Sequence, residues 1–243
     1  MRFLGLIVIT CHFLCACSLN TPQRRAVETQ KNKSISADKP NQIALLAAYT
    51  DVQRLAPDIQ VELKYATANN FLNQRLYFSI DRAYLQPDVA KRLAKVQKAL
   101  SQKHPGYHLC IYDALRPVSV QQKMWDALDS LPPVERAKFV SNPKNLSLHN
   151  MGAAIDLTLT DPNGKPLDMG AGFDDIRKIA YPCLEDSFLR TGQLTAAQIQ
   201  NRLLLRNAMQ AQGFRQLPTE WWHFNACSRP EAKRKYKVLY TEP

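Results

Sequence analysis

Runs of apolar residues with two different spacings divide most of the chain into short strands and longer helices. Apolar and polar residues alternate from Ile59 to Tyr65, which indicates a strand. From Pro87 to Lys103 apolar residues recur at helical spacing behind a proline, which favours a helix with one buried face. Residues 109–114 form an apolar run of strand length that leads into Arg116-Pro117.

The second half of the chain continues this irregular alternation. Ser119 is expected to cap a helix, and residues 153–160 are rich in small and β-branched side chains, as strands are. Thr195 to Gln198 matches a capping box, so a helix should begin there and end near Gly213. A last strand is expected over residues 221–226. This order predicts an α+β fold, with an antiparallel-rich central sheet flanked by helices.

The first residues have the pattern of a secretion signal. Met1-Arg2 is positively charged, and the apolar residues 3–14 are too few to cross a bilayer, for which about 20 are needed. The sequence Leu14-Cys15-Ala16-Cys17 then resembles a bacterial lipobox, whose final cysteine is acylated and becomes the new N-terminus. We expect residues 1–16 to be a lipoprotein signal peptide and Cys17 to be the lipidation site. Ordinary signal-peptidase cleavage after Ala16 is the alternative.

Residues 17–42 are polar and show no hydrophobic period, which predicts a flexible tether. The remaining residues, 43–243, would then form one globular domain, held to a membrane through the lipid at Cys17. Such a protein is a cell-envelope lipoprotein on the periplasmic side. In a Gram-negative cell, Ser18 rather than aspartate after the lipidated cysteine favours the outer membrane.

Composition and charge narrow the classes of partner. The chain has 243 residues, of which 45% are hydrophobic and 9% aromatic, so it is globular rather than disordered. A net charge of +11 favours anionic surfaces, but the charge is spread over solvated faces and tails, including Arg229–Lys237. No Lys/Arg stripe is interleaved with aromatic residues, so we expect no nucleic-acid partner. The pattern leaves the oligomeric state open.

Cysteine usage is that of an oxidising compartment. Of six cysteines, three either leave with the expected signal or carry the lipid. Cys110 lies in an apolar strand and is expected to be a buried thiol. Cys183 and Cys227 remain as the expected disulfide pair. CxxC spacing is absent, which excludes a structural zinc site of four cysteines.

Two short stretches carry the residues of a hydrolytic metal site. His149 is followed seven residues later by Asp156, and the sequence Glu220-Trp221-Trp222-His223 adds a second imidazole and a second carboxylate. A zinc hydrolase needs three protein ligands, an open position for water, and a nearby base for the water's proton. Asp156 lies among apolar residues, where a carboxylate is costly unless it binds a metal or, alternatively, forms a buried ion pair.

The other histidines suit this role less well. One leaves with the signal, His104 precedes a proline in a loop, and His108 opens a strand. Glu220 and His223 are three residues apart, and a regular strand would turn them to opposite faces because its period is two. We therefore expect Glu220 at the junction between a loop and the strand.

The motifs Ser147-x-His149-x-x-Gly152-x-Ala154-x-Asp156 and Glu220-x-Trp222-His223 together are specific. Further matching stretches, in the same order along the chain, are Leu63–Thr67 with Asn70-Phe71, Asp113–Pro117, and Met169-Gly170 with Phe173-Asp174. In combination they resemble the D-alanyl-D-alanine dipeptidases of the vancomycin-resistance type. Those are zinc peptidases with the DD-peptidase/Hedgehog fold, and the resemblance spans residues 50 to 228 approximately.

The resemblance implies a role for each matched residue. His149, Asp156 and His223 would bind one zinc ion, Glu220 would be the general base, and Arg116 would stabilise the oxyanion. The substrate would be D-alanyl-D-alanine or a related D,D-dipeptide, hydrolysed to free amino acids in cell-wall turnover or recycling.

The same resemblance implies the substrate contacts. Tyr65 and Asp174 would hold the free amino group of the dipeptide, and Ser147 would support the pocket. The segment Ile176 to Thr195 diverges from the family and would change the rim of that pocket.

Three alternatives belong to other functional classes. Two histidines and a carboxylate also suit a non-haem iron(II) oxygenase, but there the histidine and the acid are usually two residues apart. A non-catalytic, zinc-bearing wall-binding lipoprotein would not need both Glu220 and Arg116. A carboxypeptidase or endopeptidase acting on longer peptidoglycan stem peptides is the nearest alternative, and a clamp for a free amine at Asp174 argues for dipeptides instead.

Overall fold

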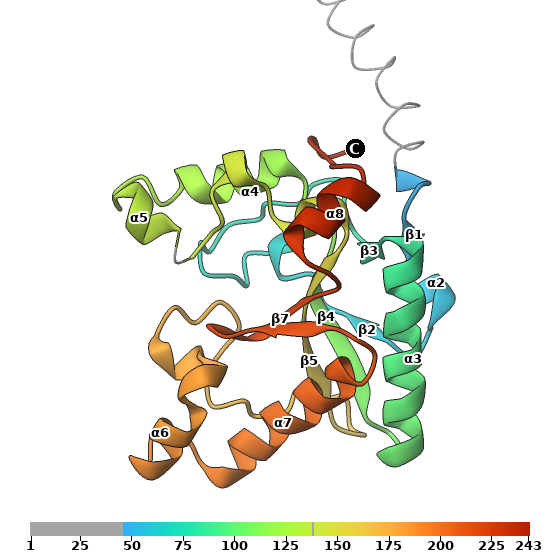
Figure 1. The fold of residues 1–243 in the computed structure, drawn as a ribbon, viewed down its shortest axis with the longest axis vertical. Helices are drawn as coiled ribbons and strands as arrows, with labels where there is room; N and C mark the ends of the chain where they lie inside the picture. Colours follow the sequence, from blue (N-terminus) through green and yellow to red (C-terminus); the bar gives the residue numbers. More distant parts are fainter. Residues whose placement is uncertain (1–45, 138) are drawn as a thin grey trace, which may run out of the picture. The chain divides into compact units, whose positions relative to one another are not determined.

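The computed structural model describes residues 46–137 and 139–243, which are built around a five-stranded sheet (Figure 1). In spatial order its strands are β2 (Gln60–Val61), β4 (His108–Asp113), β5 (Ala154–Thr160), β7 (Glu220–Asn225) and β6 (Arg215–Leu217). β2 runs parallel to β4 and every other neighbouring pair is antiparallel. The expected α+β fold with an antiparallel-rich sheet is confirmed.

Two long helices and this sheet bury the main core. α3 (Pro87–Lys103) and α7 (Ala196–Gln210) contact each other, and they pack on β4 and β5 respectively. Buried side chains fill the space between them, among them Leu93, Leu100, Leu109, Ile111, Leu157 and Leu205. α3 begins at Pro87 as expected, and Thr195 and Gln198 form the expected capping box of α7.

Shorter elements surround this core (Figure 1). The short helices are α2 (Val52–Leu55), α4 (Val118–Asp126), α5 (Pro133–Arg136), α6 (Glu185–Arg190) and α8 (Arg229–Lys235). The 3-10 turns are η1 (Lys64–Ala66), η2 (Pro143–Asn145), η3 (Leu148–Met151), η4 (Lys178–Ala180) and η5 (Pro182–Leu184). β1 (Thr50–Asp51) and β3 (Tyr84–Leu85) pair in a separate two-stranded sheet. Within residues 46–137 and 139–243, no helix has the length and apolar character needed to cross a membrane.

Several local expectations were wrong. The strand expected from Ile59 to Tyr65 is limited to Gln60–Val61, because the chain then turns into η1 and buries Tyr65, whose carbonyl accepts hydrogen bonds from the amides of Leu76 and Tyr77. α4 begins at Val118, with Pro117 rather than Ser119 at its N-cap.

The basic side chains of residues 229–237 are exposed to solvent, as expected, but most of this tail also forms a helix, α8, which was not expected. Ser228 caps this helix, Pro230 lies in its first turn, and Ala232 is buried against its neighbours. The helix also contacts η3, the turn that carries His149. The sequence Ser-x-Pro shortly after a strand is a helix-start signal, which the excess of basic residues obscured.

The expected disulfide between Cys183 and Cys227 is wrong: both are free thiols, Cys183 exposed and Cys227 buried. The amide of Cys183 bonds to the carbonyl of Pro218, just before β7 begins, whereas Cys227 follows the end of that strand. Six residues of strand span roughly 20 Å, and a disulfide joins Cα atoms only about 4.4–6.8 Å apart. Cys110 is buried, as expected.

The expected signal peptide, the lipidation site at Cys17 and the tether lie outside the described residues.

Candidate metal centre

Three polar side chains form a row across the middle of the sheet. Asp156 on β5 is paired with His223 on β7, and on its other side with Asp113 on β4. Residues directly opposite one another on neighbouring strands have side chains on the same face, with Cβ atoms about 4.5–5.5 Å apart. The strand pairing therefore places these three side chains next to one another before any side-chain interaction is considered.

A β-bulge in β4 makes this row possible. Cys110 lies opposite Thr158, on the face that Asp156 shares, so regular alternation would turn Asp113 to the opposite face. The register shifts between Ile111 and Asp113, which brings Asp113 opposite Asp156. Bulges redirect a side chain in this way and are frequent beside active sites.

His149 reaches the same point from η3, just before β5. Ser147 and Asn150 form a capping box around this turn, and the turn ends at Gly152, whose φ of 62° is left-handed. A Cβ at Gly152 would lie 3.0 Å from a ring carbon of Tyr49 and 3.2 Å from the amide nitrogen of Gln86. Glycine therefore serves here both the backbone conformation and the close approach of the chain.

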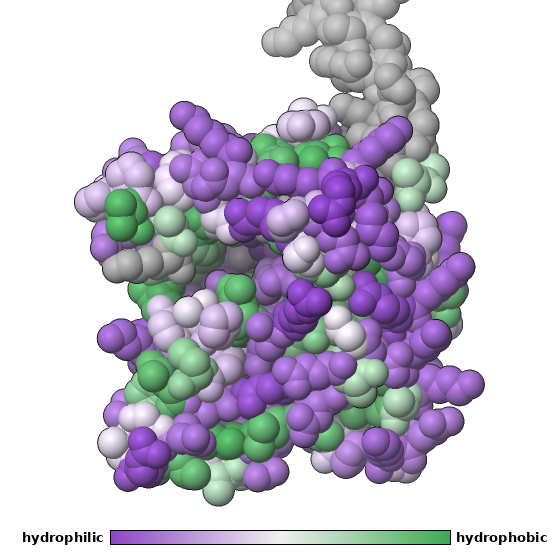
Figure 2. Space-filling view, viewed as in Figure 1, coloured by the Kyte–Doolittle hydropathy of each residue, from purple (hydrophilic) through white to green (hydrophobic). Residues whose placement is uncertain are grey.

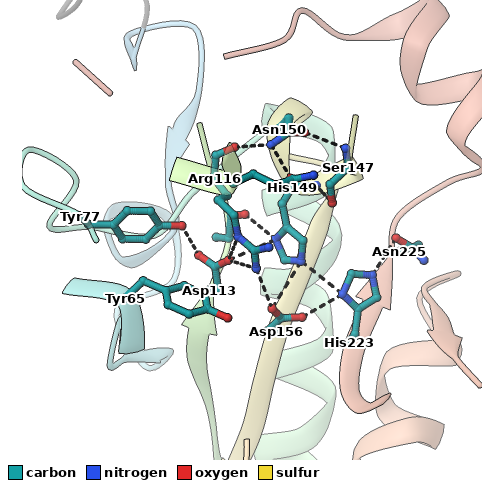
Figure 3. A network of polar contacts seen from close by, with 12 residues as sticks. Tyr65, Tyr77, Asp113, Arg116, Ser147, His149, Asn150, Asp156, His223 and Asn225 are labelled. Carbon is teal, nitrogen blue, oxygen red and sulfur yellow. Dashed lines mark hydrogen bonds and ion pairs between the residues drawn. The ribbon is translucent and has the colours of Figure 1, made fainter. Parts of the chain in front are cut away.

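The two imidazoles and the carboxylate converge on one point (Figure 3). His149 Nε2 lies 3.2 Å from His223 Nδ1 and 3.4 Å from Asp156 Oδ2, and His223 Nδ1 lies 2.9 Å from Asp156 Oδ1. All three side chains are buried, and one donor atom from each lies within 4.8 Å of the other two. Donors bound to zinc at about 2.0–2.1 Å in a tetrahedron are ~3.3–3.4 Å apart, so the spacing fits a tetrahedral metal.

Hydrogen bonds select which nitrogen of each ring faces this point. His149 Nδ1 lies 2.7 Å from the carbonyl oxygen of Ala114, which can only accept, so Nδ1 carries the proton and Nε2 is free to bind a metal. His223 has the opposite arrangement, since its Nε2 lies 3.0 Å from Oδ1 of Asn225 and its Nδ1 faces the cluster. Outer partners of this kind orient metal-binding histidines.

The electrostatics of the donors also suit a cation. Burial alone would raise the pKa of Asp156, but the imidazoles of His149 and His223 outweigh burial and lower that pKa far below its usual range. Burial alone would lower the pKa of His223, whereas the hydrogen bond and charge of Asp156 raise it to about 9. Without a metal, His223 and Asp156 therefore hold a proton between them, and metal binding releases it.

Arg116 lies beside the donors and is fixed from several sides. Its Nε donates to Asp113 Oδ2 at 2.8 Å, and its Nη2 lies 3.5 Å from Asp156 Oδ2. The Tyr77 hydroxyl donates to the other oxygen of Asp113 at 2.6 Å. The Arg116 carbonyl accepts from the Asn150 side chain, which ties the arginine to the turn that carries His149. A guanidinium held in this way can stabilise negative charge with little reorganisation.

Glu220 is the first residue of β7, directly after the turn from β6, as expected. Its Oε2 lies 3.8 Å from His223 Nδ1, and its side chain is 26% exposed, which leaves it open to water. Burial raises the pKa of Glu220, and the positive charge of His223 opposes that effect. A carboxylate with a raised pKa next to a metal position suits the transfer of protons near neutral pH.

Tyr65 and Asp174 form a second polar pair at the cavity wall. The Tyr65 hydroxyl donates to both carboxylate oxygens of Asp174, at 3.1 and 3.0 Å. Asp174 has a φ of 60°, a left-handed conformation that costs about 1–3 kcal/mol in a residue other than glycine and often occurs at binding sites. Burial, and then the charge of Asp156, raise the pKa of Asp174 well above its usual value. An added cation would offset both effects.

A cavity of about 130 Å³ joins these groups, and every residue expected in the site except Cys17 and the cysteine pair lines it. Figure 2 shows the corresponding hollow in the surface, between the segment of α4 and α5 above and the segment of α6 below. Ile176 and Tyr181 contribute to its rim, so the divergent segment does border the pocket. A space of this size suits a small substrate.

Sequence reasoning did not identify three residues that orient the site. Asp113 holds Arg116, Asn150 closes the turn around His149, and Asn225 fixes the ring of His223. For Asp113 a signal existed, because it is a carboxylate at the end of an apolar strand, as Asp156 is in its own strand. Asn225 lies two residues after the candidate ligand His223 on the same strand, and this spacing alone does not indicate a role in the site.

We expect Asn225→Ala to lower zinc affinity about 10–100-fold, because His223 loses the partner that orients it. Asn225→Asp keeps an acceptor and should retain the affinity. Asn163→Ala, in the exposed turn after β5, is the matched control and should change nothing. Competition with a chromogenic chelator measures all three. Equal zinc affinities of Asn225→Ala and the wild type would show that Asn225 does not orient His223 for metal binding.

Comparison with known proteins identifies the family of the chain. A family model described as D-ala-D-ala dipeptidase, Peptidase_M15, matches residues 46–241. The D-alanyl-D-alanine dipeptidase of Escherichia coli K12 is 38% identical over 174 residues, which cover 72% of this chain and 82% of that protein. The protein of the same name from Synechocystis is 30% identical over 168 residues, covering 58% and 68%.

Among solved structures, a zinc-bound mutant of the vancomycin-resistance D,D-pentapeptidase VanY matches with 15% identity and a TM-score of 0.34. The match covers 65% of this chain and 80% of that chain, and so low a similarity carries no argument about the site. The family model and the two relatives are sufficient: the chain belongs to the D-ala-D-ala dipeptidase family of M15 peptidases.

Proposed function

We propose that this protein is a zinc-dependent dipeptidase that hydrolyses D-alanyl-D-alanine, or a related D,D-dipeptide, to free amino acids. The observation that carries the proposal is the buried cluster of His149, Asp156 and His223, with the Glu220 carboxylate 3.8 Å from a ligand nitrogen. Membership of the family and the names of its relatives support the choice of substrate. An iron oxygenase would not require Glu220 in that place, and a binding protein would not require Arg116 fixed beside the donors.

The mechanism assigns a proton path to Glu220. When bound, zinc acidifies a water molecule and polarises the scissile carbonyl. Glu220 accepts a proton from the attacking water as its oxygen bonds to the carbonyl carbon. The same carboxyl then donates that proton to the amide nitrogen as the carbon–nitrogen bond breaks, so two amino acids leave. Its raised pKa helps the first step, because a more basic carboxylate accepts the proton of the water more readily.

Arg116 stabilises the negative charge that develops on the carbonyl oxygen. It lines the cavity, and Asp113 on its far side holds the guanidinium in one orientation. Because this charge arises only as the reaction proceeds, a fixed donor favours the transition state over the substrate.

The free amino group of the substrate binds at Asp174 and Tyr65. An ammonium supplies the cation that the buried carboxylate of Asp174 lacks, and Tyr65 holds that carboxylate in place. An acylated nitrogen, as in a longer stem peptide, carries no charge and cannot make this ion pair. The pair therefore favours dipeptides over the carboxypeptidase or endopeptidase substrates of the nearest alternative.

We propose further that residues 1–16 are a lipoprotein signal and that Cys17 anchors the domain to a membrane through the tether at 17–42. The enzyme would then act in the cell envelope, in the outer membrane if the cell is Gram-negative, on dipeptide released during wall turnover. The support is the sequence alone: a charged start, an apolar run and the lipobox ending in Cys17.

Glu220→Gln should keep zinc and the fold and lose nearly all hydrolysis. Glutamine has the same shape but cannot accept a proton, and loss of a general base typically costs ~10²–10⁴ in rate. Glu62→Gln, which changes an exposed acid beside Lys64, is the control and should retain full activity. Near-normal turnover by Glu220→Gln would contradict the mechanism, and loss of its zinc would make Glu220 a ligand.

Asp174→Asn should change substrate preference. Asparagine tolerates the left-handed conformation but offers no charge to an ammonium. Hydrolysis of D-alanyl-D-alanine should fall about 10–100-fold, as expected for loss of a charged hydrogen bond, while N-acetyl-D-alanyl-D-alanine is little affected. Asp186→Asn, which alters an exposed acid in the first turn of α6 outside the cavity lining, is the matched control. Equal losses on both substrates would make the role of Asp174 structural.

Cys17→Ser should release the protein from membranes in its native cell, because serine cannot be acylated. Cys15→Ser alters the neighbouring signal cysteine and should leave the protein membrane-bound. Fractionation followed by immunoblotting distinguishes the two. A wild-type protein found in the soluble fraction would refute the lipid anchor.

A further inference from the structure

The cavity is rich in acidic groups, which would repel the carboxylate of a bound dipeptide. Asp156, Asp174, Asp175 and Glu220 all line it. A dipeptide is a zwitterion, and the proposed function places its ammonium at Asp174. Its carboxylate, on the second and last residue of the substrate, requires a positive group on the other side of the metal centre.

Arg116 is not available for that carboxylate. It is buried, and its guanidinium is already bonded to Asp113 and close to Asp156. It also lies over the Tyr65 ring, 5.1 Å from its centroid, which is the side of the cavity assigned to the amino group.

Arg229 is the other arginine that lines the cavity. Within residues 46–137 and 139–243, its guanidinium takes part in no ion pair, hydrogen bond or ring contact, although four acids line the same cavity. Its backbone, in contrast, is fixed, because it is the first residue of α8 and Ser228 caps that helix. The side chain is exposed at the cavity wall and free to pair with a ligand.

Asn225, four residues before Arg229 in the sequence, lies on the required side of the cluster. Figure 3 shows Tyr65 and Asn225 on opposite sides of the cluster of His149, Asp156 and His223. Arg229 follows Asn225 by four residues and lines the same cavity, and α8 contacts η3, which begins directly after Ser147. A dipeptide whose amino group is at Tyr65 and Asp174 and whose scissile bond is at the metal centre would extend toward the side of Asn225, from which the chain leads into α8.

We propose that Arg229 binds the terminal carboxylate of the dipeptide and so selects substrates that end one residue after the scissile bond. The inference rests on the proposed function, because it assumes that a dipeptide is cleaved at this centre. A guanidinium can bind a carboxylate through two parallel hydrogen bonds, which fixes the orientation of the leaving residue as well as its charge. Asp174 and Arg229 together would then recognise the two charged ends of the dipeptide.

The test compares D-alanyl-D-alanine with its C-terminal amide, which keeps the ammonium and the scissile bond but lacks the carboxylate. In the wild type the acid should be favoured over the amide about tenfold in kcat/KM, mainly through KM, as loss of one charged hydrogen bond predicts. In Arg229→Gln this preference should disappear, because only the acid loses a contact. Arg229→Lys should recover part of it, since the charge remains but the paired geometry is lost.

Arg234→Gln is the matched control, because it removes the same charge from the same helix at an exposed position outside the cavity lining. It should retain the preference of the wild type. An unchanged acid-to-amide ratio in Arg229→Gln, or an equal loss on both substrates, overturns the inference. Failure of the proposed function would differ, because the wild type itself would then hydrolyse neither substrate. Zinc content and melting temperature of Arg229→Gln should equal those of the wild type, which separates its effect from misfolding.

Discussion

The arrangement depends on the need to neutralise charge inside the sheet. Asp113 and Asp156 are both buried, on neighbouring strands and on the same face, and a carboxylate in such a place is very unfavourable without a cation. Arg116 lies between them and can neutralise one of the two charges. The second charge is balanced either by a proton held with His223 or by a metal ion. The buried negative charge of the fold therefore favours binding of a metal ion, independently of any role in catalysis.

The same demand explains how segments distant in sequence are held together. The turn carrying His149 is tied to Arg116 through Asn150, and Arg116 is tied through Asp113 to Tyr77. Each bond orients a group that would otherwise be free, so the donors are already in place when a metal arrives. Preorganisation of this kind reduces the cost of binding the metal and of stabilising charge in the reaction.

The sequence predicted the long periodic elements and the chemistry well, and the local connections poorly. α3 was expected from apolar residues at helical spacing, β4 from an apolar run, β5 from small and β-branched residues, and α7 from its capping box. His149, Asp156, His223 and Glu220 were expected because together they supply the ligands and the base of a zinc hydrolase. The short strands β1 and β3 form by pairing with each other across more than thirty residues of sequence, which no local pattern reveals.

The residues that orient the candidate ligands could not be predicted from the sequence for a related reason. The bulge that turns Asp113 toward Asp156 depends on the register of two strands, and the role of Asn225 depends on which ring nitrogen of His223 faces inward. The proposed cysteine pair failed because counting cysteines says nothing of the strand that separates them. These are properties of tertiary geometry, whereas the candidate ligands could be selected from the sequence.

The most direct test of the account is diffraction at the zinc absorption edge from crystals of the zinc-loaded protein. We expect one anomalous peak per chain, about 2.0–2.2 Å from His149 Nε2, His223 Nδ1 and one oxygen of Asp156, with Glu220 outside bonding distance. Zinc at a different set of residues, or bound through Nδ1 of His149 or Nε2 of His223, would contradict the site derived from the fold.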